Sequence, residues 1–215
     1  RYRELLEKQN VMDFSSIQTD IWNLFSENEE VCKAVQDKIH YVMVDEYQDT
    51  NYIQEQLVFK IIGDRKNICV VGDDDQGMYR FRGATIRNIL EFPDKFEKNE
   101  CQIIHLNGNY RSEPGIIDFY NRWMENAAGI NLFNWDKYRY PKQIQAKKSN
   151  VRPGSSVYFC GGDSIDTEKH ELLEMIQRLQ SNGNISNLNQ IAFLFKSVKS
   201  KEAVETAEYL ETNGI

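Results

Sequence analysis

The sequence predicts an α/β protein built around parallel strands, and three features carry that prediction. Short β-branched apolar runs at residues 41–44 and 68–71 are typical of buried strands, and acidic residues follow each run. Between them, apolar side chains recur at helical spacing over residues 51–62. A strand, a helix and a second strand of these lengths require a parallel crossover. The chain has 215 residues, of which 40% are hydrophobic and 27% charged, so it can bury a core.

The remaining elements continue this alternation along the chain. Ser112 as a cap and Pro114 in a first helical turn predict a helix after a third strand. Residues 131–155 interrupt the pattern as an irregular, basic connection. In chain order, the other expected elements are helices over residues 1–9, 16–25 and 29–39, strands over 102–106 and 157–160, a helix over 167–180, a strand over 191–195 and a helix over 201–212 that Gly214 ends.

The composition excludes several classes of protein. No apolar stretch approaches the roughly 18 residues that a membrane helix needs, so no membrane partner is expected. The four cysteines form no CxxC pair, which disfavours a zinc site or a disulfide framework and favours a reducing, cytoplasmic setting. The chain begins with Arg1 and shows no targeting segment, so we expect it to be a piece of a longer protein.

The net charge of −7 argues at first sight against a nucleic-acid partner, because phosphate binding usually leaves a basic footprint. The charge is unevenly distributed, however, since residues 1–98 carry a net charge of −6 and residues 99–215 a net charge of −1. The excess of acids in the first half therefore indicates a local acidic site and does not by itself exclude DNA.

Acidic side chains follow both strands of the predicted crossover. Asp45 and Glu46 come directly after the first strand, and residues 73–76 (DDDQ) come after the second. Ligands gather at the carboxyl ends of the strands in a parallel sheet. Adjacent carboxylates there suit a magnesium-nucleotide site, in which one holds the ion and the next orients or deprotonates a water. Taken alone, an Asp-Glu pair is more often a solvated turn, so both interpretations stand at this point.

Three longer segments resemble motifs of the UvrD/Rep/PcrA family of superfamily 1 helicases. Residues 44–51 (VDEYQDTN) resemble the Walker B motif, or motif II, residues 70–84 (VVGDDDQGMYRFRGA) resemble motif III, and residues 106–112 (LNGNYRS) resemble motif IV. Their order and spacing also match. The resemblance implies two RecA-like domains of the P-loop NTPase type, the later part of the first over residues 1–98 and the beginning of the second over residues 99–215.

The resemblance also implies ATP and Mg²⁺ as cofactors and assigns catalytic roles by position. Asp45 matches the carboxylate associated with Mg²⁺, and Glu46 matches the carboxylate that activates water. Gln76 matches a glutamine that senses the γ-phosphate. Arg111 matches an arginine that reaches the same phosphate from the second domain, where it would neutralise charge that develops during transfer.

Further positions match residues that bind nucleotide. Tyr110 matches the residue that stacks on adenine, and Gln48 matches one that couples the nucleotide to motif III. Asp73 is expected to contribute to the same site. Asp74 falls at a variable position of motif III and is expected to be solvated. Thr50 or Asn51 is as well suited to cap a helix as to bind a ligand.

Tyr79, Phe81 and Arg82 match the motif III positions that face single-stranded DNA. An aromatic plane under a base contributes about 1 to 3 kcal/mol and tolerates any sequence, as a translocating motor requires. On pattern alone, core packing is the more frequent role of two such aromatic side chains, and the resemblance favours DNA contact for both. The basic residues between 137 and 152 are expected mainly to form a solvated face, with contact to DNA phosphates as the alternative.

The sequence also lacks features that the family uses. Nowhere in the chain is there a GxxxxGK[ST] loop, whose amides and lysine cradle phosphates, and motifs V and VI are absent. We therefore expect a fragment of an ATP-dependent 3′–5′ DNA helicase that moves on single-stranded DNA and acts at duplex junctions, with the isolated fragment inactive. Two alternatives are the motor portion of an AddA- or RecB-like helicase-nuclease and a non-hydrolysing DNA-binding relative.

Overall fold

The computed structural model describes residues 1–79, 83–130, 139–151, 156–159, 161 and 164–215. The chain forms two compact units. Unit 1 comprises Arg1–Ser112 and Ile117–Ser149, and unit 2 comprises Glu113–Ile116 and Asn150–Ile215. In the part of the chain that the structure describes, no helix is both long and apolar enough to cross a membrane.

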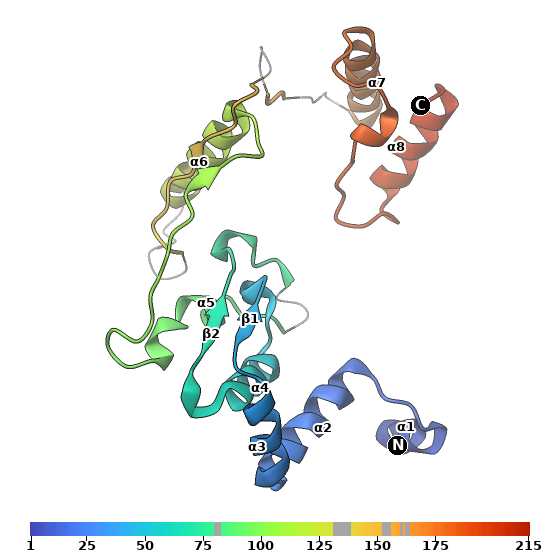
Figure 1. Ribbon diagram of the computed structural model, residues 1–215. Helices are drawn as coiled ribbons and strands as arrows, with labels where there is room; N and C mark the ends of the chain where they lie inside the picture. Colours follow the sequence, from blue (N-terminus) through green and yellow to red (C-terminus); the bar gives the residue numbers. More distant parts are fainter. Residues whose placement is uncertain (80–82, 131–138, 152–155, 160, 162–163) are drawn as a thin grey trace. The chain divides into compact units, whose positions relative to one another are not determined.

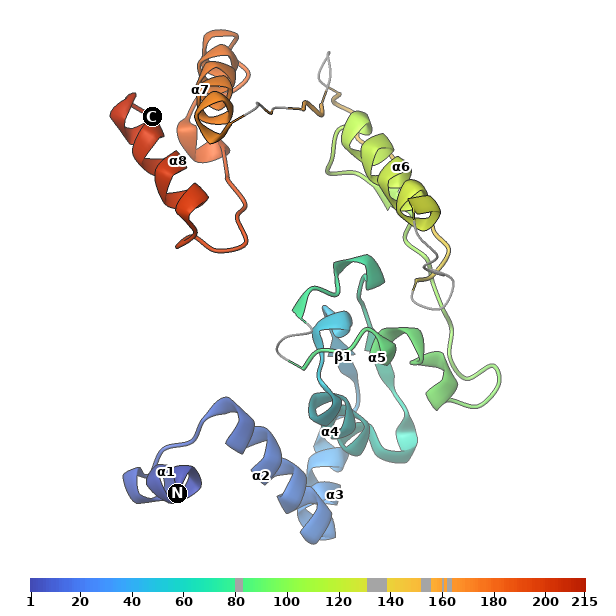
Figure 2. The same cartoon turned by 180° about the vertical axis from the view of Figure 1, so that it is seen from behind.

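Unit 1 begins with three helices, which lie where the periodicity predicts them. They are α1 (Tyr2–Gln9), α2 (Phe14–Glu27) and α3 (Glu29–Lys38). The helices α2 and α3 pack against α4 (Tyr52–Ile62), as Figures 1 and 2 show. Phe25, Cys32 and Leu57 are buried where the three helices meet. Each helix thus contributes one side chain to a shared apolar core.

The central sheet of unit 1 confirms the predicted parallel crossover. Strand β1 (Val42–Val44) pairs in parallel with β2 (Ile68–Val70), and Val42 lies opposite Ile68. The helix α4 connects the two strands, which lie side by side in Figure 1. Asn51 caps α4, because its side chain accepts the backbone N–H of Gln54 while the Gln54 side chain accepts that of Asn51. This reciprocal cap resolves the two interpretations of Asn51 in favour of a structural one.

An aromatic cluster packs beside α4 and holds the loop that follows β1. Tyr47 is completely buried, and its ring meets Phe92 edge to face with ring centroids 5.3 Å apart. Its hydroxyl donates to Glu55 Oε1 at 3.2 Å, and Lys95 Nζ contacts Glu55 Oε2 at 3.0 Å. Burial and the nearby Glu55 carboxylate raise the pKa of Tyr47 above its ordinary value, so the hydroxyl stays protonated as a donor.

The rest of unit 1 contains shorter elements and one long helix. These are α5 (Arg87–Leu90), β3 (Gly108–Asn109), most of α6 (Pro114–Ile130) and β4 (Gln145–Ala146). Strand β3 pairs in parallel with β4, so that Gly108 lies opposite Gln145. The side chain of Asn121 in α6 exchanges two hydrogen bonds with the backbone of Ile144, which ties α6 to the segment that leads into β4.

Unit 2 is built on α7 (Ile165–Ser181) and α8 (Lys201–Thr212), both close to their predicted positions. The two helices pack against each other, and Leu173, Ile176 and Leu210 form the buried centre of their interface. Ser164 and Ser200 cap the two helices by accepting backbone N–H groups in the first turn.

Three strand predictions are wrong within the described residues. Residues 102–106 and 191–195 form no strand, and neither do the described residues 157–159 of the third segment. The side chains of Leu106, Phe159 and Leu194 are 80%, 95% and 97% exposed. A strand requires backbone hydrogen bonds to a neighbouring strand, whereas an apolar run encodes only a preference for extended backbone. The correction concerns the pairing and leaves the α/β class with its parallel sheets in place.

Candidate functional site

The loop after β1 places two carboxylates at the carboxyl end of the sheet. Asp45 and Glu46 are both exposed, and Asp45 Oδ1 accepts the backbone N–H of Glu46 at 2.9 Å. Glu46 has a left-handed backbone with φ of 50°, which is uncommon for a residue other than glycine. The turn Tyr47–Asp49 follows at once. Strained backbone of this kind is concentrated at functional loops, where the surrounding structure holds it.

A chain of hydrogen bonds joins this loop to the loop after β2. Gln48 Nε2 donates to Glu46 Oε2 at 2.6 Å, and the backbone N–H of Asp73 donates to Gln48 Oε1 at 3.0 Å. Gln76 Nε2 then donates to Asp73 Oδ2 at 2.8 Å. The structure therefore brings four of the sequence-predicted site residues together. Gln48 is the centre of this chain and is only 2% exposed.

Gly72 makes room for the Gln48 side chain. A Cβ atom on Gly72 would lie 2.6 Å from Gln48 Oε1 and 2.7 Å from Ile89 Cδ1. Both distances are shorter than real Cβ atoms tolerate, so a larger residue would displace the Gln48 amide. The glycine of motif III thus allows the second loop to approach the first.

Two basic residues from the segment before β4 pair with the acids of the loop after β2, residues 73–76, which we call the acidic loop. Lys142 Nζ lies 2.5 Å from Asp73 Oδ1, 2.5 Å from Asp74 Oδ1 and 3.1 Å from Asp75 Oδ2. Arg139 Nε lies 2.8 Å from Asp75 Oδ1. The Lys142 and Arg139 side chains are only 11% and 15% exposed.

Two sequence expectations are corrected by these contacts. Asp74 was expected to be solvated, but it is buried, and besides Lys142 it accepts the backbone N–H of Tyr140 at 2.7 Å. The basic segment was expected mainly to form a solvated face, but Arg139 and Lys142 point into the acidic loop. A buried carboxylate needs such a partner because an isolated charge is costly to remove from water.

The ion pairs set the protonation of the acidic loop. Burial alone would raise the pKa of Asp73, but hydrogen bonds from Lys142 and Gln76 outweigh burial and lower it. Burial opposes ionisation of Asp75 too, and hydrogen bonds from Arg139 and Tyr120 bring its pKa below the usual value. The pKa of Lys142 is raised, because its carboxylate partners outweigh burial, which acts the other way. These three groups are therefore charged at neutral pH.

Tyr110 and Arg111 lie at a different place in unit 1, next to β3. The Asn109 side chain accepts the backbone N–H groups of Arg111 and Ser112 at 3.0 and 2.8 Å, and so forms a tight turn. Tyr110 is 75% exposed, and Arg111 is exposed as well. Among the described residues, no hydrogen bond or ion pair joins the Tyr110 and Arg111 side chains to the hydrogen-bonded series that links Glu46 to Gln76. The structure therefore does not bring the two groups together.

The expected DNA-facing residues are only partly described. Tyr79 follows the acidic loop and is 37% exposed. Phe81 and Arg82 lie outside the described residues. This intermediate exposed fraction leaves both interpretations of Tyr79 open, as a contact for a base and as a packing residue.

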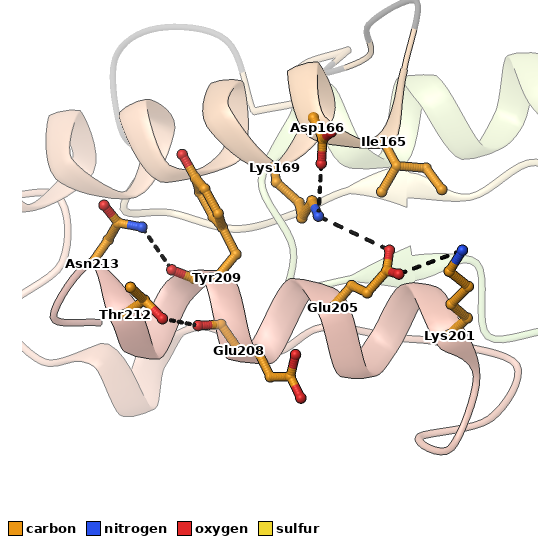
Figure 3. A pocket seen from close by; sticks show the side chains of 9 residues that line it. All are labelled: Ile165, Asp166, Lys169, Lys201, Glu205, Glu208, Tyr209, Thr212 and Asn213. Atoms are coloured by element: carbon orange, nitrogen blue, oxygen red, sulfur yellow. Dashed lines mark hydrogen bonds and ion pairs between the residues drawn. The ribbon is translucent and has the colours of Figure 1, made fainter.

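A groove in unit 2 contains none of the sequence-predicted site residues. It runs between α7 and α8, where Lys169 Nζ lies 3.0 Å from Asp166 Oδ1 and 4.0 Å from Glu205 Oε2 (Figure 3). Lys201 also contacts Glu205, at 3.6 Å. The contact between Lys169 and Glu205 joins the two helices, whereas the other two ion pairs each lie within one helix. Ion pairs of this kind are typical of a structural helix interface.

Sequence reasoning missed several residues that surround the acidic loop. Tyr120 in α6 donates a hydrogen bond to Asp75 Oδ2, and the Tyr140 hydroxyl donates to the carbonyl oxygen of Leu90 at 3.1 Å. Among the described side chains, Asp49 Oδ1 is a buried oxygen without a hydrogen-bond partner. The basic run around Pro141 was the only sequence signal for Lys142, and a charge run does not reveal its partners.

Comparison with known proteins identifies the family. Residues 1–97 match the family described as UvrD/REP helicase N-terminal domain, and residues 104–215 match the UvrD-like helicase C-terminal domain. The chain is 31% identical over 204 residues to ATP-dependent DNA helicase PcrA of Staphylococcus aureus (strain Mu50), which covers 95% of this chain and 26% of that protein. PcrA of Bacillus subtilis (strain 168) is 32% identical over the same shares.

A further relative has the same relationship to the chain. The probable DNA helicase II homolog of Rickettsia conorii is 33% identical over 199 residues, which cover 91% of this chain and 29% of that protein. The chain thus spans about a quarter of the length of the curated relatives it matches. With two adjoining family matches and the motif geometry of the β1 and β2 loops, the chain belongs to the UvrD-like helicase family.

Proposed function

We propose that the full-length protein is an ATP-dependent DNA helicase that moves 3′ to 5′ on single-stranded DNA and unwinds duplex junctions. Family membership supports this proposal, and the relatives are named ATP-dependent DNA helicases. The observation that carries it is the chain of hydrogen bonds from Glu46 through Gln48 and Asp73 to Gln76. It links the two acidic loops at the carboxyl end of one sheet, where α/β proteins bind nucleotides.

The residues at this end of the sheet fit Mg²⁺. The ion prefers oxygen ligands and commonly binds to proteins through one or two carboxylates, with waters and substrate phosphates completing its shell. Asp45 and Glu46 supply exposed carboxylates of this kind. Asp45 would hold the ion, which supplies charge neutralisation at the phosphates when bound.

Glu46 would act as the general base. The Gln48 amide donates to Glu46 Oε2 and so orients the carboxylate, while Oε1 accepts no hydrogen bond from the described residues. That oxygen can accept a proton from an attacking water. Gln76, held by Asp73, would contact the γ-phosphate from the second loop. Each group would thus act from a position that the other loop helps to fix.

Arg111 and Tyr110 would complete the nucleotide site from the β3 region. The exposed guanidinium of Arg111 would neutralise charge on the transferred phosphoryl group, and the exposed Tyr110 ring would stack on adenine. Tyr79, Phe81 and Arg82 would contact single-stranded DNA. Base stacking there would give an affinity that does not depend on sequence.

We further propose that the chain contains the later part of a first RecA-like domain up to residue 98 and the opening of a second from residue 99. The family matches, which end at residue 97 and resume at residue 104, support this boundary. Cys32, Cys69 and Cys101 are free thiols, in keeping with a reducing, cytoplasmic setting.

The substitution Glu46→Gln in the full-length protein tests the proposed chemistry. The amide keeps the shape of the side chain but cannot accept the proton, so steady-state ATP hydrolysis should fall by at least about 100-fold. Binding of a fluorescent ATP analogue should remain within about threefold, because the substituted amide would leave the phosphate contacts of the other residues in place. The control is Glu30→Gln, an exposed glutamate of α3.

Near-normal hydrolysis in the Glu46→Gln protein would show that the base is wrongly assigned. Absence of hydrolysis in the unaltered protein, with DNA binding retained, would support the non-hydrolysing alternative. Nuclease activity of the full-length protein would support the helicase-nuclease, an alternative that the names of the relatives do not favour.

A further inference from the structure

The ammonium group of Lys142 lies among the carboxylates of the acidic loop after β2. Its ammonium group contacts a carboxylate oxygen of Asp73, Asp74 and Asp75, all within 3.1 Å. The side chain is 11% exposed, so water screens these contacts poorly. With Arg139 on Asp75, the loop holds three carboxylates against two cations.

The contact with Asp73 differs from the other two because Asp73 is hydrogen-bonded to other proposed site residues. Asp73 Oδ2 accepts from Gln76, and the Asp73 backbone N–H donates to Gln48, which in turn donates to Glu46. Lys142 therefore stands at one end of a hydrogen-bonded path that ends on the carboxylate of the proposed base. Asp74, by contrast, is held by Lys142 and by the backbone N–H of Tyr140.

Lys142 and Asp73 come from regions that match different family domains. Lys142 lies within residues 104–215 and Asp73 within residues 1–97, although both belong to unit 1. Asp75 is anchored separately by Arg139 and Tyr120. The loop would therefore stay attached without Lys142, while Asp73 would lose the cation that fixes its carboxylate.

We propose that Lys142 is a positioning residue for ATP hydrolysis, which holds Asp73 and through it Gln48, Gln76 and Glu46. The inference rests on the proposed function. Lys142 itself touches no reacting atom in this scheme. Its ammonium group fixes the Asp73 carboxylate, which orients the Gln76 amide. The same contact holds the Asp73 backbone, whose N–H donates to Gln48.

The test compares Lys142→Met, Lys142→Arg and Lys147→Met in the full-length protein. Lys142→Met should lower kcat by roughly tenfold to hundredfold, the scale of a small misplacement of reacting groups, with KM changed by less than about threefold. Lys142→Arg keeps the charge and should restore at least part of the loss. Lys147 is an exposed lysine directly after β4 and has no ion pair with the acids after β2 among the described residues, so Lys147→Met should leave kcat and KM unchanged.

A second measurement needs no turnover. Amide hydrogen exchange of the peptide covering residues 71–77 should be faster in Lys142→Met than in Lys147→Met, because the Asp73 N–H bond to Gln48 loosens. Unchanged exchange there would contradict the proposal, since the path would then be intact without the lysine.

A pair of carboxylate variants separates positioning from general stabilisation. Asp73→Asn should lower kcat as Lys142→Met does, and the double variant should be no worse than Asp73→Asn alone. Asp74→Asn should lower the thermal midpoint while kcat stays within about threefold. Equal losses of kcat in Asp73→Asn and Asp74→Asn would show a merely structural role and overturn the proposal.

Hydrolysis by the unaltered protein and by Glu46→Gln tests the proposed function independently of Lys142. If the unaltered protein hydrolyses ATP and Glu46→Gln does not, the function stands, and normal kcat in Lys142→Met then refutes the positioning role alone. If the unaltered protein does not hydrolyse ATP, the function and the inference that rests on it are both wrong.

Discussion

At the scale of one residue, Gln48 shows how a polar side chain can be buried when its amide is hydrogen-bonded at both ends. Its amide is 2% exposed, and both of its ends are used, one as a donor to Glu46 and one as an acceptor from Asp73. Leaving either end unpaired would cost about 1 to 3 kcal/mol. The pattern DEYQD placed Gln48 near the carboxylates, but its connection to the second loop depends on the pairing of β1 with β2.

Gly72→Ala should disturb this connection. The new Cβ would meet Gln48 Oε1 and Ile89 Cδ1 at distances that require one of them to move. We expect the free energy of unfolding to fall by about 1 to 3 kcal/mol, as overpacking typically causes, measured by urea denaturation. The full-length Gly72→Ala protein should also lose ATP turnover.

Gly77→Ala is the matched control in the same loop. Its Cβ would have its nearest neighbour, Ile86 Cδ1, at 3.5 Å, which is an ordinary contact. Stability should therefore change little. If Gly72→Ala proved as stable as Gly77→Ala, the close packing of the two loops around Gln48 would be disproved.

At the scale of elements, helices were predictable from local signals and strands were only partly so. The helix α4 has its periodicity and its Asn51 cap within a dozen residues, so both are visible in the sequence. The run at residues 102–106 has a similar apolar character to β1, yet it has no partner strand among the described residues. The difference arises because strand pairing is a non-local property.

The helix α6 is tied to the acidic loop by Tyr120, and this tie should depend on pH. Burial, and then the hydrogen bond to Asp75, raise the pKa of Tyr120 to about 12, while Arg139 and Lys142 oppose the shift. The ordinary pKa of a tyrosine hydroxyl, which we take for the unfolded chain, is 10.0. Because the folded pKa is the higher one, the stabilisation is complete below pH 10 and is lost as the pH rises from 10 towards 12.

Urea denaturation of the unaltered chain and of Tyr120→Phe measures this effect. The difference in stability between the two should shrink as the pH rises from about 9 to about 12. Tyr52→Phe removes a hydroxyl from a side chain that is 70% exposed and should show no such trend. A constant difference between the unaltered chain and Tyr120→Phe over this range would contradict the contact with Asp75.

At the scale of the whole molecule, the chain corresponds to one part of its longer relatives. It matches both family domains, yet spans about a quarter of the length of its relatives. The described residues include the loops of motifs II and IV and the beginning of motif III. The GxxxxGK[ST] loop that would cradle the phosphates occurs nowhere in the 215 residues.

The purified chain of 215 residues should therefore not hydrolyse ATP. Without the amides and the lysine of that loop, the phosphates lack their main ligands, although Glu46 and Gln48 are in place. A coupled assay for phosphate release measures this, with the full-length protein as the positive control. Release that Glu46→Gln abolishes would show that the chain is sufficient for turnover.

The sequence by itself determined the α/β class, the positions of the longer helices, the β1–α4–β2 crossover and the family. These features depend on short-range periodicity and on contiguous motifs, which can be read along the chain. The tertiary structure alone decided that Gln48 bridges the two acidic loops and that Lys142, 69 residues after Asp73, pairs with the acids of the second loop. Such contacts arise because folding buries charges that are distant in the sequence, and a buried charge is costly unless it is paired with an opposite one.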